Sequence, residues 1–380
     1  MKILVSAGEV SGDIHGAYLV RELKKLRPDI YFFGVGSERM SAEGVDIKFD
    51  ISKRGTIGIF EALPHLLPLY LTFLNLKKLI SAEKPDLALL IDSQGFNMPL
   101  ANYCKRLGIK TVYYISPQEW LWGTPRGVKK VVNTVDLIVA IFKREYDVYK
   151  QAGGQVVYFG HPLVDIVKPT MSREEARNKF FSFSSGPTIC LCPGSRTQEI
   201  VRLLPILLKS AVLIQKEYPR AQFLVPAPSQ PTLYYINSII SHSSLVISHL
   251  SVIEDQIYDA LFASDLSLCA SGTINLEASL LGVPNVMIYK LSPLTFFIGK
   301  HLLKIDRKLK YFSMPNLLLD SPIIPELVMS RANPAMISQE AISLLSDPSR
   351  LIKMKSSFSF LSSFLGRPGV IEKIAKAILS

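Results

Sequence analysis

The short polar stretch Ser271-Gly272-Thr273 is the first candidate for ligand binding. It follows an apolar run and precedes a helical pattern, so it is predicted to lie where a buried strand ends and a helix begins. The first turn of such a helix presents free backbone N–H groups and a positive dipole end, which attract anionic groups. Glu277 follows Thr273 by four residues and is therefore expected on the same helix face, where its carboxylate can accept hydrogen bonds from a ribose diol. Glycine loops are common in α/β domains, so this motif needs support from the rest of the chain.

A second candidate is the turn Gly194-Ser195-Arg196, which follows the apolar run at 188–192. A glycine-containing turn from strand to helix can bring backbone N–H groups to a phosphate, and an arginine can bind a phosphate through two parallel hydrogen bonds. Together the two turns predict the nucleotide half of a sugar-nucleotide site.

Asp92 is the candidate general base. It directly follows the apolar run at 87–91, so its carboxylate is expected to be fixed and partly desolvated at the carboxyl end of a buried strand. Ligands of open parallel sheets bind at that edge. His15 and Asp13 are the next candidates for the same role.

Polar residues also follow the first predicted strand: Glu9, Ser11, Asp13 and His15. One interpretation is that Ser11 or Asp13 caps the helix that begins there. The other is that these side chains line a pocket for a polyhydroxylated substrate. The sequence favours neither interpretation over the other.

Two α/β series are needed to position these residues. A chain of 380 residues exceeds the usual size of a single core, and a hinge is predicted from Gly160-His161-Pro162 to Pro169. Strands are predicted at 3–7, 30–35, 87–91, 111–115, 137–141 and 155–159 before the hinge, and at 188–192, 222–226, 244–248 and 265–270 after it. The glycines at 8, 12 and 16 are four residues apart, unlike the G-x-G-x-x-G fingerprint, so no nicotinamide or flavin cofactor is expected.

The net charge of +11, from 43 basic and 32 acidic residues, predicts an anionic partner. Residues 57–80 are strongly apolar, but their uncharged run at 62–76 is too short to span a bilayer and is interrupted by prolines. The segment is either an amphipathic helix whose apolar surface lies in a membrane interface or holds an acyl chain, or an ordinary buried helix. Residues 293–312 mix lysines with aromatic side chains, which suits an anionic membrane surface. The N-terminus has no signal-peptide pattern and the four cysteines lie in apolar settings, so a cytoplasmic protein with reduced thiols is expected.

Seven motifs in order along nearly the whole chain resemble the lipid-A-disaccharide synthase family: AGEVSGDIHGA (7–17), IDSQGFN (91–97), SPQEWLW (116–122), GHPLVD (160–165), PGSRTQEI (193–200), SGTINLEASLLGVP (271–284) and SMPNLLL (313–319). The resemblance implies an α/β GT-B fold of two Rossmann-like domains facing across a cleft. The implied domains are an acceptor-binding domain at 1–165, a UDP-sugar-binding domain at 166–365, and a C-terminal helix at 366–380 that packs back on the first domain. The implied reaction is an inverting transfer from UDP-2,3-diacylglucosamine to 2,3-diacylglucosamine 1-phosphate, giving the β(1→6) disaccharide 1-phosphate and UDP.

The resemblance also implies roles for individual residues. Asp92 matches the essential aspartate of the family. The residues predicted to bind the UDP-sugar are Gly194, Ser195, Arg196, Ser271, Gly272, Thr273, Glu277 and Asn316, and those predicted to bind the acceptor are Glu9, Ser11, Asp13 and Asn97. Family members often read I-D-x-P-D-F-N where this chain has Gln94 and Gly95, so a second carboxylate is missing there and more weight falls on Asp92. The chain has no D-x-D sequence, so no metal is expected at the pyrophosphate; helix dipoles, N–H groups and Arg196 would stabilise the leaving UDP.

The implied location is peripheral, on the cytoplasmic face of the inner membrane, and a homo-oligomer is compatible with the sequence. A UDP-sugar epimerase would share the two-domain fold, but it would not explain the apolar segments at 57–80 and 293–312. A nucleic-acid-binding protein would explain the net charge, but no nucleic-acid-binding motif is present, and no nucleic-acid partner is expected.

Overall fold

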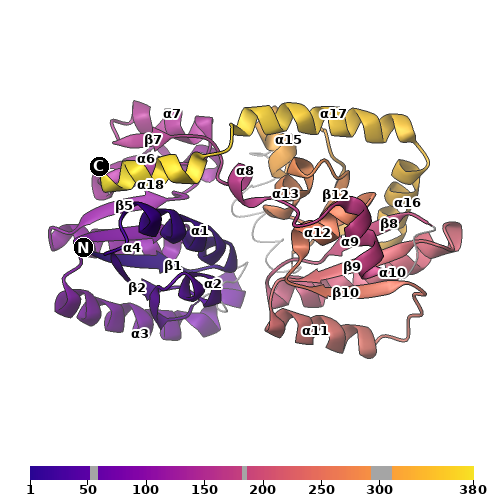
Figure 1. Cartoon of the computed structure of the whole chain (residues 1–380), viewed down its shortest axis with the longest axis horizontal. Helices are drawn as coiled ribbons and strands as arrows, with labels where there is room; N and C mark the ends of the chain where they lie inside the picture. Colours follow the sequence, from indigo (N-terminus) through magenta and orange to yellow (C-terminus); the bar gives the residue numbers. More distant parts are fainter. Residues whose placement is uncertain (52–58, 182–185, 292–309) are drawn as a thin grey trace. The chain divides into compact units, whose positions relative to one another are not determined.

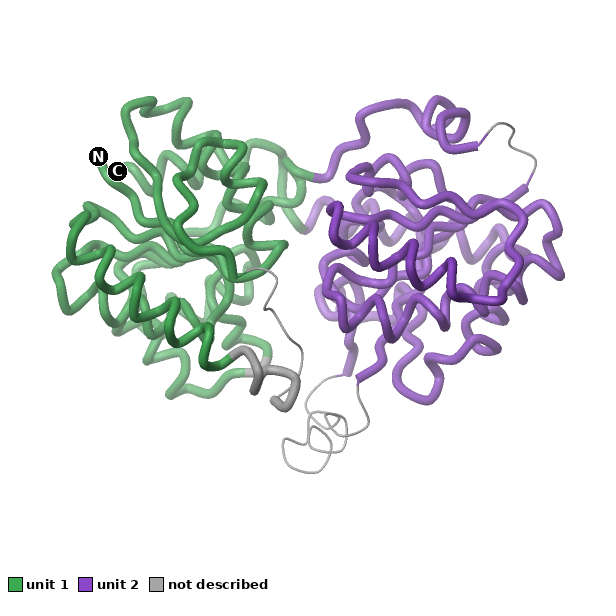
Figure 2. The backbone as a smooth tube through the Cα atoms, turned by 90° about the horizontal axis from the view of Figure 1, so that it is seen from below, with its two compact units in different colours: residues 1–166, 365–380 green, residues 167–364 purple. Residues whose placement is uncertain are grey.

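The computed structural model describes residues 1–51, 59–181, 186–291 and 310–380. The chain forms two compact units, of which unit 1 comprises residues 1–166 and 365–380 and unit 2 comprises residues 167–364 (Figure 2). Each unit is a parallel sheet whose strands alternate with helices along the chain (Figure 1). The α/β fold class predicted from the sequence is therefore confirmed.

The sheet of unit 1 has the strand order β3-β2-β1-β4-β5-β6-β7. Its central strands are continuous apolar runs, as expected when helices cover both faces of a parallel sheet; all five residues of β4 are buried. The strands are β1 (Lys2–Ala7), β2 (Tyr31–Val35), β3 (Asp46–Phe49), β4 (Leu87–Ile91), β5 (Lys110–Tyr114), β6 (Leu137–Ala140) and β7 (Val156–Tyr158). The helices are α1 (Val10–Leu26), α2 (Glu38–Ala42), α3 (Ile59–Glu83), α4 (Gln94–Arg106), α5 (Glu119–Trp122), α6 (Pro125–Thr134), α7 (Lys143–Gln151), α8 (Leu163–Ile166) and α18 (Val370–Leu379).

The helix α18 completes unit 1 although it lies more than 200 residues after the unit's other elements. It packs against α1 and buries Val370, Ile371 and Ile374 (Figure 1). The Asp165 carboxylate accepts hydrogen bonds from the N–H groups of Gly369 (2.7 Å) and Ile371 (2.8 Å), so it caps the start of this helix.

The sheet of unit 2 has the order β10-β9-β8-β11-β12-β13. Its strands are β8 (Thr188–Cys192), β9 (Gln222–Ala227), β10 (Leu250–Glu254), β11 (Leu266–Ala270), β12 (Asn285–Tyr289) and β13 (Glu326–Val328). Its helices are α9 (Arg173–Phe180), α10 (Thr197–Glu217), α11 (Gln230–Ser241), α12 (Ile257–Ala263), α13 (Ile274–Leu280), α15 (Met314–Leu319), α16 (Pro334–Leu345) and α17 (Pro348–Leu365), of which Leu365 is assigned to unit 1.

The two units repeat one topology. In each, the fourth strand in chain order pairs with the first, β4 with β1 and β11 with β8. Strand order reverses at these pairs, and ligands of open α/β sheets bind beside such switch points. Asp92 follows β4 and Ser271 follows β11, so the two main candidate sites occupy equivalent positions in the two units.

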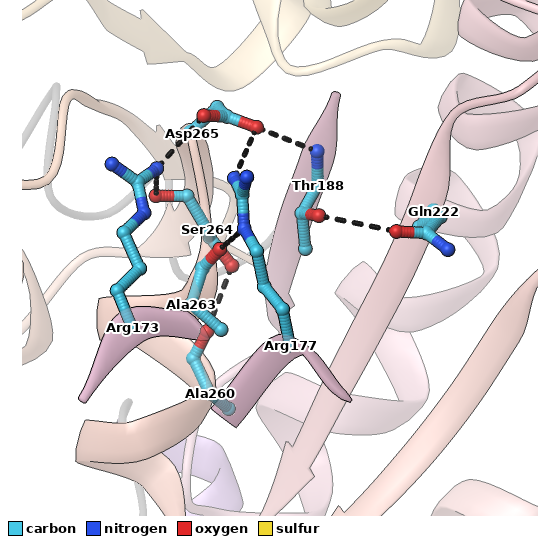
Figure 3. Close-up of polar contacts among 8 residues, drawn as sticks. All are labelled: Arg173, Arg177, Thr188, Gln222, Ala260, Ala263, Ser264 and Asp265. Atoms are coloured by element: carbon cyan, nitrogen blue, oxygen red, sulfur yellow. Dashed lines mark hydrogen bonds and ion pairs between the residues drawn. The ribbon is translucent and has the colours of Figure 1, made fainter. Parts of the chain in front are cut away.

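The opposite edge of the sheet in unit 2 is tied together by Asp265 (Figure 3). Its carboxylate accepts hydrogen bonds from Arg173 (2.8 Å), Arg177 (2.6 Å) and the Thr188 N–H group (2.8 Å). Arg173 and Arg177 lie one turn apart on α9, so a single carboxylate joins that helix to the starts of β8 and β11.

The predicted strands agree with the observed ones to within one residue, except for the strand predicted at 244–248, which is wrong. That segment is irregular, and Val246 is 84% exposed; the strand that pairs with β9 is Leu250–Glu254. Two short apolar runs adjoin here, and their periodicity could not reveal which one reaches β9. The short edge strands β3 and β13 were not predicted.

Candidate functional site

The residue predicted as general base, Asp92, lies at the carboxyl end of β4 with its side chain partly exposed. Asp92 and Ser93 both adopt left-handed backbone conformations, with φ of 51° and 49°. For residues other than glycine each such conformation costs of order 1–3 kcal/mol and persists only where the surroundings enforce it. Here the Asp92 N–H group donates to the Tyr114 carbonyl (3.1 Å), and its carbonyl accepts from the Tyr113 hydroxyl (2.7 Å).

Asn97, predicted to bind the acceptor, is fully buried. Its amide nitrogen donates to the carbonyls of Ser6 (3.1 Å), Ile91 (3.0 Å) and Asp92 (2.9 Å), and its oxygen accepts from the Ser6 hydroxyl (2.6 Å). These bonds join the ends of β1 and β4 and hold the Asp92 backbone. Asn97 is therefore a positioning residue in this structure, and direct contact with an acceptor stays a prediction.

The expectation that Ser11 or Asp13 caps α1 is wrong. The cap position of α1 is Glu9, no side chain caps it, and Ser11 and Asp13 lie inside the helix. Asp13 is buried, and its two carboxylate oxygens accept hydrogen bonds from the N–H groups of Ser37 (2.7 Å) and Arg39 (3.0 Å), so it caps α2 instead. Burial raises the pKa of Asp13, against the lowering effect of these backbone hydrogen bonds. Glu9 and Ser11 are partly exposed beside it.

His15, the alternative base, lies in a buried aromatic group with Tyr114 and His161. Its ring centroid is 6.1 Å from that of Tyr114 and 6.5 Å from that of His161. Burial lowers the pKa of His15 to about 4, so its imidazole is neutral at pH 7. Within the described part of the chain, the His15 Nδ1 atom and the Tyr114 hydroxyl have no hydrogen-bond partner. A ring that is buried like a core residue, and whose basicity burial lowers, is poorly suited to replace Asp92.

The loop after β5 is held by a carboxylate that sequence reasoning missed. Glu145 on α7 is buried and accepts hydrogen bonds from the Ser116 hydroxyl and from the N–H groups of Ile141 (2.8 Å) and Phe142 (3.2 Å). Burial raises the pKa of Glu145 to about 7. Its only sequence signal was a glutamate at the third position of a helix, which is typical of a capping box. Trp120 of this loop packs its ring on Phe142, with centroids 5.6 Å apart.

The phosphate-binding turn of unit 2 adopts the predicted position between β8 and α10. A carboxylate already lies at its N–H groups: Glu199 accepts hydrogen bonds from the N–H groups of Ser195 (3.3 Å) and Arg196 (3.4 Å) and from the Arg196 guanidinium (3.2 Å). Gly194 has a left-handed φ of 115°, and a side chain there would overlap the Glu199 carboxylate. The turn thus binds an anionic group of its own chain with the donors predicted for phosphate.

The Ser271–Thr273 loop leads into α13 as predicted, and Gly272 and Thr273 are exposed. Thr273 and Tyr258 hydrogen-bond to the Glu277 carboxylate, which confirms that Glu277 and Thr273 share one helix face; burial raises the pKa of Glu277. Asn275 was missed by sequence reasoning. It is buried and donates to the Ala270 carbonyl (2.8 Å) at the end of β11, as Asn97 does to Ile91 at the end of β4.

Asn316, predicted to contact the donor, is buried and ties α15 to the segment before β13. Its amide nitrogen donates to the Ile324 carbonyl (2.9 Å) and to Glu326 (2.8 Å), and its oxygen accepts from the Ile324 N–H group (2.9 Å). A role in donor binding stays a prediction. Across the described ranges, no cluster of three or more histidine, cysteine or acidic side chains could hold a metal ion.

Two α/β units, each with a parallel sheet and a strand-order switch point, are the architecture of GT-B type proteins. A model of the family described as Lipid-A-disaccharide synthetase matches residues 3–365. The lipid-A-disaccharide synthase of Geobacter sulfurreducens is 39% identical to this chain, and the match covers 100% of this chain and 96% of the relative. The lipid-A-disaccharide synthase of Nitrosococcus oceani is 38% identical, and the match covers 96% of this chain and 92% of the relative. The chain belongs to the lipid-A-disaccharide synthase family, glycosyltransferases of lipid A biosynthesis, whose substrates are a UDP-sugar and a lipid-linked glucosamine.

Among solved structures, the UDP-GlcNAc 2-epimerase of Neisseria meningitidis bound to UDP-GlcNAc has a TM-score of 0.64 with this chain. It is 13% identical, and the match covers 100% of this chain and 98% of that one. At this identity the likeness concerns the fold alone, so the epimerase alternative has no support beyond a shared architecture.

Proposed function

We propose that this chain transfers the sugar of UDP-2,3-diacylglucosamine to the 6-hydroxyl of 2,3-diacylglucosamine 1-phosphate, with inversion at the anomeric carbon. The products are the β(1→6) disaccharide 1-phosphate and UDP. The observation that carries the proposal is Asp92, a strained, partly exposed carboxylate at the switch point of unit 1 in a chain of this family.

In the proposed mechanism, Asp92 accepts the proton of the acceptor hydroxyl while that oxygen attacks the anomeric carbon of the donor. The bond from this carbon to the UDP oxygen breaks, and UDP leaves with the electron pair. General-base catalysis of this kind contributes about 10² to 10⁴-fold to the rate. Asn97 and Tyr113 act through the Asp92 backbone, which they hold by hydrogen bonds.

We assign acceptor binding to unit 1, with Glu9 and Ser11 as direct contacts, because they are partly exposed beside the switch point. Asp13 and Asn97 are buried and hold the backbone of this edge by hydrogen bonds. UDP-sugar binding is assigned to unit 2. Arg196 and the N–H groups of the Gly194–Ser195 turn are proposed to exchange Glu199 for the diphosphate, and the Ser271–Thr273 loop with Glu277 is proposed to bind the nucleoside. Asn316 keeps a supporting role through α15.

We further propose that the protein binds the cytoplasmic surface of the inner membrane, where its acylated substrates lie. No described helix is long and apolar enough to cross a bilayer. On α3, however, Leu66, Leu67, Tyr70 and Leu71 are each at least half exposed and lie on one side of the helix. Most of the basic segment 293–312 lies outside the described residues; of its lysines, Lys310 pairs with Asp320 at 3.2 Å.

One assay tests the transfer directly. The protein is incubated with UDP-diacylglucosamine and the monosaccharide 1-phosphate, and UDP release and disaccharide formation are measured together. We expect both products only when both substrates are present. UDP release without acceptor would indicate hydrolysis, and conversion of the donor to an epimer would indicate the alternative activity.

A further inference from the structure

A hydrogen bond joins the segments that follow β4 and β5. Neither of its two residues was predicted to bind substrate or to take part in catalysis. The Gln94 amide nitrogen donates to the Glu119 carboxylate at 2.9 Å. Gln94 is two residues from Asp92, and Glu119 begins α5 in the loop that follows β5. The two strands are adjacent, with Ile91 opposite Tyr114, so the bond links the carboxyl ends of neighbouring strands.

Glu119 is fixed from several directions. Gly123 and Gly127 make room for its carboxylate, since a side-chain carbon at either position would overlap it. Gly127 lies in the first turn of α6, where the positive dipole end favours a carboxylate nearby. The preceding Pro117 is held by a hydrogen bond from the Tyr149 hydroxyl to its carbonyl (2.5 Å). Glu119 is therefore a fixed acceptor to which the β4 loop can be attached.

The β4 loop needs such an attachment. Asp92 and Ser93 are both left-handed; hydrogen bonds hold the Asp92 N–H group and carbonyl, and the Ser93 carbonyl accepts from the N–H groups of Phe96 (3.0 Å) and Asn97 (2.9 Å) in the first turn of α4. Strained loops relax unless the surrounding structure holds them on both sides. The Gln94–Glu119 bond adds a side-chain attachment from the start of α4 to the segment after β5.

We propose that Glu119 is a positioning residue for the reaction: held between Gly123 and Gly127, its carboxylate fixes Gln94 and so keeps Asp92 in its strained, reactive conformation. The inference deepens the proposed function, on which it rests. In this inference Glu119 positions the base Asp92 and does not contact substrate.

Four variants test it with substrates saturating: Glu119→Ala, Gly127→Ala, Gln94→Glu, and a swap of the two side chains. Glu119→Ala removes the acceptor, and Gly127→Ala displaces it, since the added carbon would meet only Glu119 side-chain atoms at the shortest distances. The swap Gln94→Glu with Glu119→Gln rebuilds the bond with its direction reversed. We expect the first two to lower kcat by about 10- to 100-fold, the range for a hydrogen bond to a charged group, with UDP affinity unchanged. The swap should recover kcat to within a few-fold of the parent, while Gln94→Glu alone should not.

Glu372→Ala is the matched control, because it removes a glutamate from an exposed pair on α18 with Lys376. Hydrogen exchange at the Asp92 amide, measured without substrates, should accelerate in Glu119→Ala and not in the control. Wild-type kcat in Glu119→Ala, or a swap no more active than Gln94→Glu, would overturn the inference. A parent protein without transferase activity would instead overturn the proposed function, and the exchange measurement would still test the attachment of the loop.

Discussion

At the scale of single residues, Asp92 combines a partly exposed carboxylate with a backbone held by Tyr113, Tyr114 and Asn97. We expect Asp92→Asn to retain the fold and UDP affinity and to lose about 10² to 10⁴-fold in kcat, because the amide cannot accept the proton. Steady-state kinetics with both substrates, together with UDP titration, checks this. Turnover within a few-fold of the parent would exclude Asp92 as the base.

A second prediction at this scale concerns the nucleotide. Arg196→Ala should weaken UDP binding by about 10- to 100-fold, the range for a charge-assisted hydrogen bond. Glu277→Ala should weaken UDP binding more than binding of a 2′-deoxy analogue. Tyr258→Phe is the matched control, since it removes a partner of Glu277 but keeps the carboxylate. Isothermal titration measures the affinity of the three variants for both nucleotides. If Glu277→Ala lost the same affinity for UDP as for the 2′-deoxy analogue, Glu277 would be a structural helix residue.

The sequence could predict residues whose chemistry follows from their place at a strand end, such as Asp92 and Arg196. It could not predict which polar side chains are already paired within the chain. Asn97, Asp13 and Asn316 were predicted to contact substrate; in the structure each holds backbone groups, and substrate contact stays a prediction. Those partners come from distant segments, up to 91 residues away for Asn97 and Ser6, and local spacing carries no information about such pairs.

At the scale of elements, Glu145 should make stability depend on pH. Its pKa is about 7 in the folded chain against an ordinary 4.5, a difference of roughly 3 kcal/mol. A raised carboxyl pKa means that the folded state binds the proton more tightly, so this stability is present below pH 4.5 and is lost as the pH rises through 7. The parent's advantage in unfolding free energy over Glu145→Gln should therefore be larger at pH 5 than at pH 8. Urea unfolding at both pH values measures it, and an advantage independent of pH would contradict the raised pKa.

Asp265 should matter for stability and not for ligand binding. Removing its carboxylate by Asp265→Ala leaves Arg173, Arg177 and the Thr188 N–H group without their shared acceptor (Figure 3). We expect a loss of about 1–3 kcal/mol in unfolding free energy, since these are charge-assisted but partly exposed bonds. UDP affinity should not change. Asp147→Ala, which breaks an exposed pair with Lys143, is the control and should cost much less.

Elements were predicted best where burial on both faces made a strand continuously apolar, as in β4 and β8. Prediction was poorest at sheet edges. The strand β10 is only partly buried, and a neighbouring run with similar periodicity was chosen in its place. Such choices depend on which segment pairs with β9, which is a tertiary property.

At the scale of the whole molecule, the exposed apolar side of α3 should govern membrane binding. Leu67→Ser with Leu71→Ser should weaken binding to anionic vesicles by about tenfold or more, since each partly exposed leucine contributes about 1 kcal/mol on insertion. Val246→Ser, at an apolar residue of unit 2 that is more exposed than either leucine, should have no effect. Vesicle co-sedimentation at low and high salt checks this. If the double leucine variant bound vesicles as well as the parent at high salt, α3 would be excluded as the attachment.

The return of α18 to unit 1 has a consequence for synthesis of the protein. The Asp165 carboxylate and the α1 surface that α18 covers are made early, whereas Gly369 and Ile371 leave the ribosome about 200 residues later. The apolar face of α1 therefore stays uncovered while the whole of unit 2 is translated, because α18 follows unit 2 in the chain. We therefore expect unit 2 to complete its fold before unit 1 does, and the nascent chain to depend on chaperones most before residue 370 emerges.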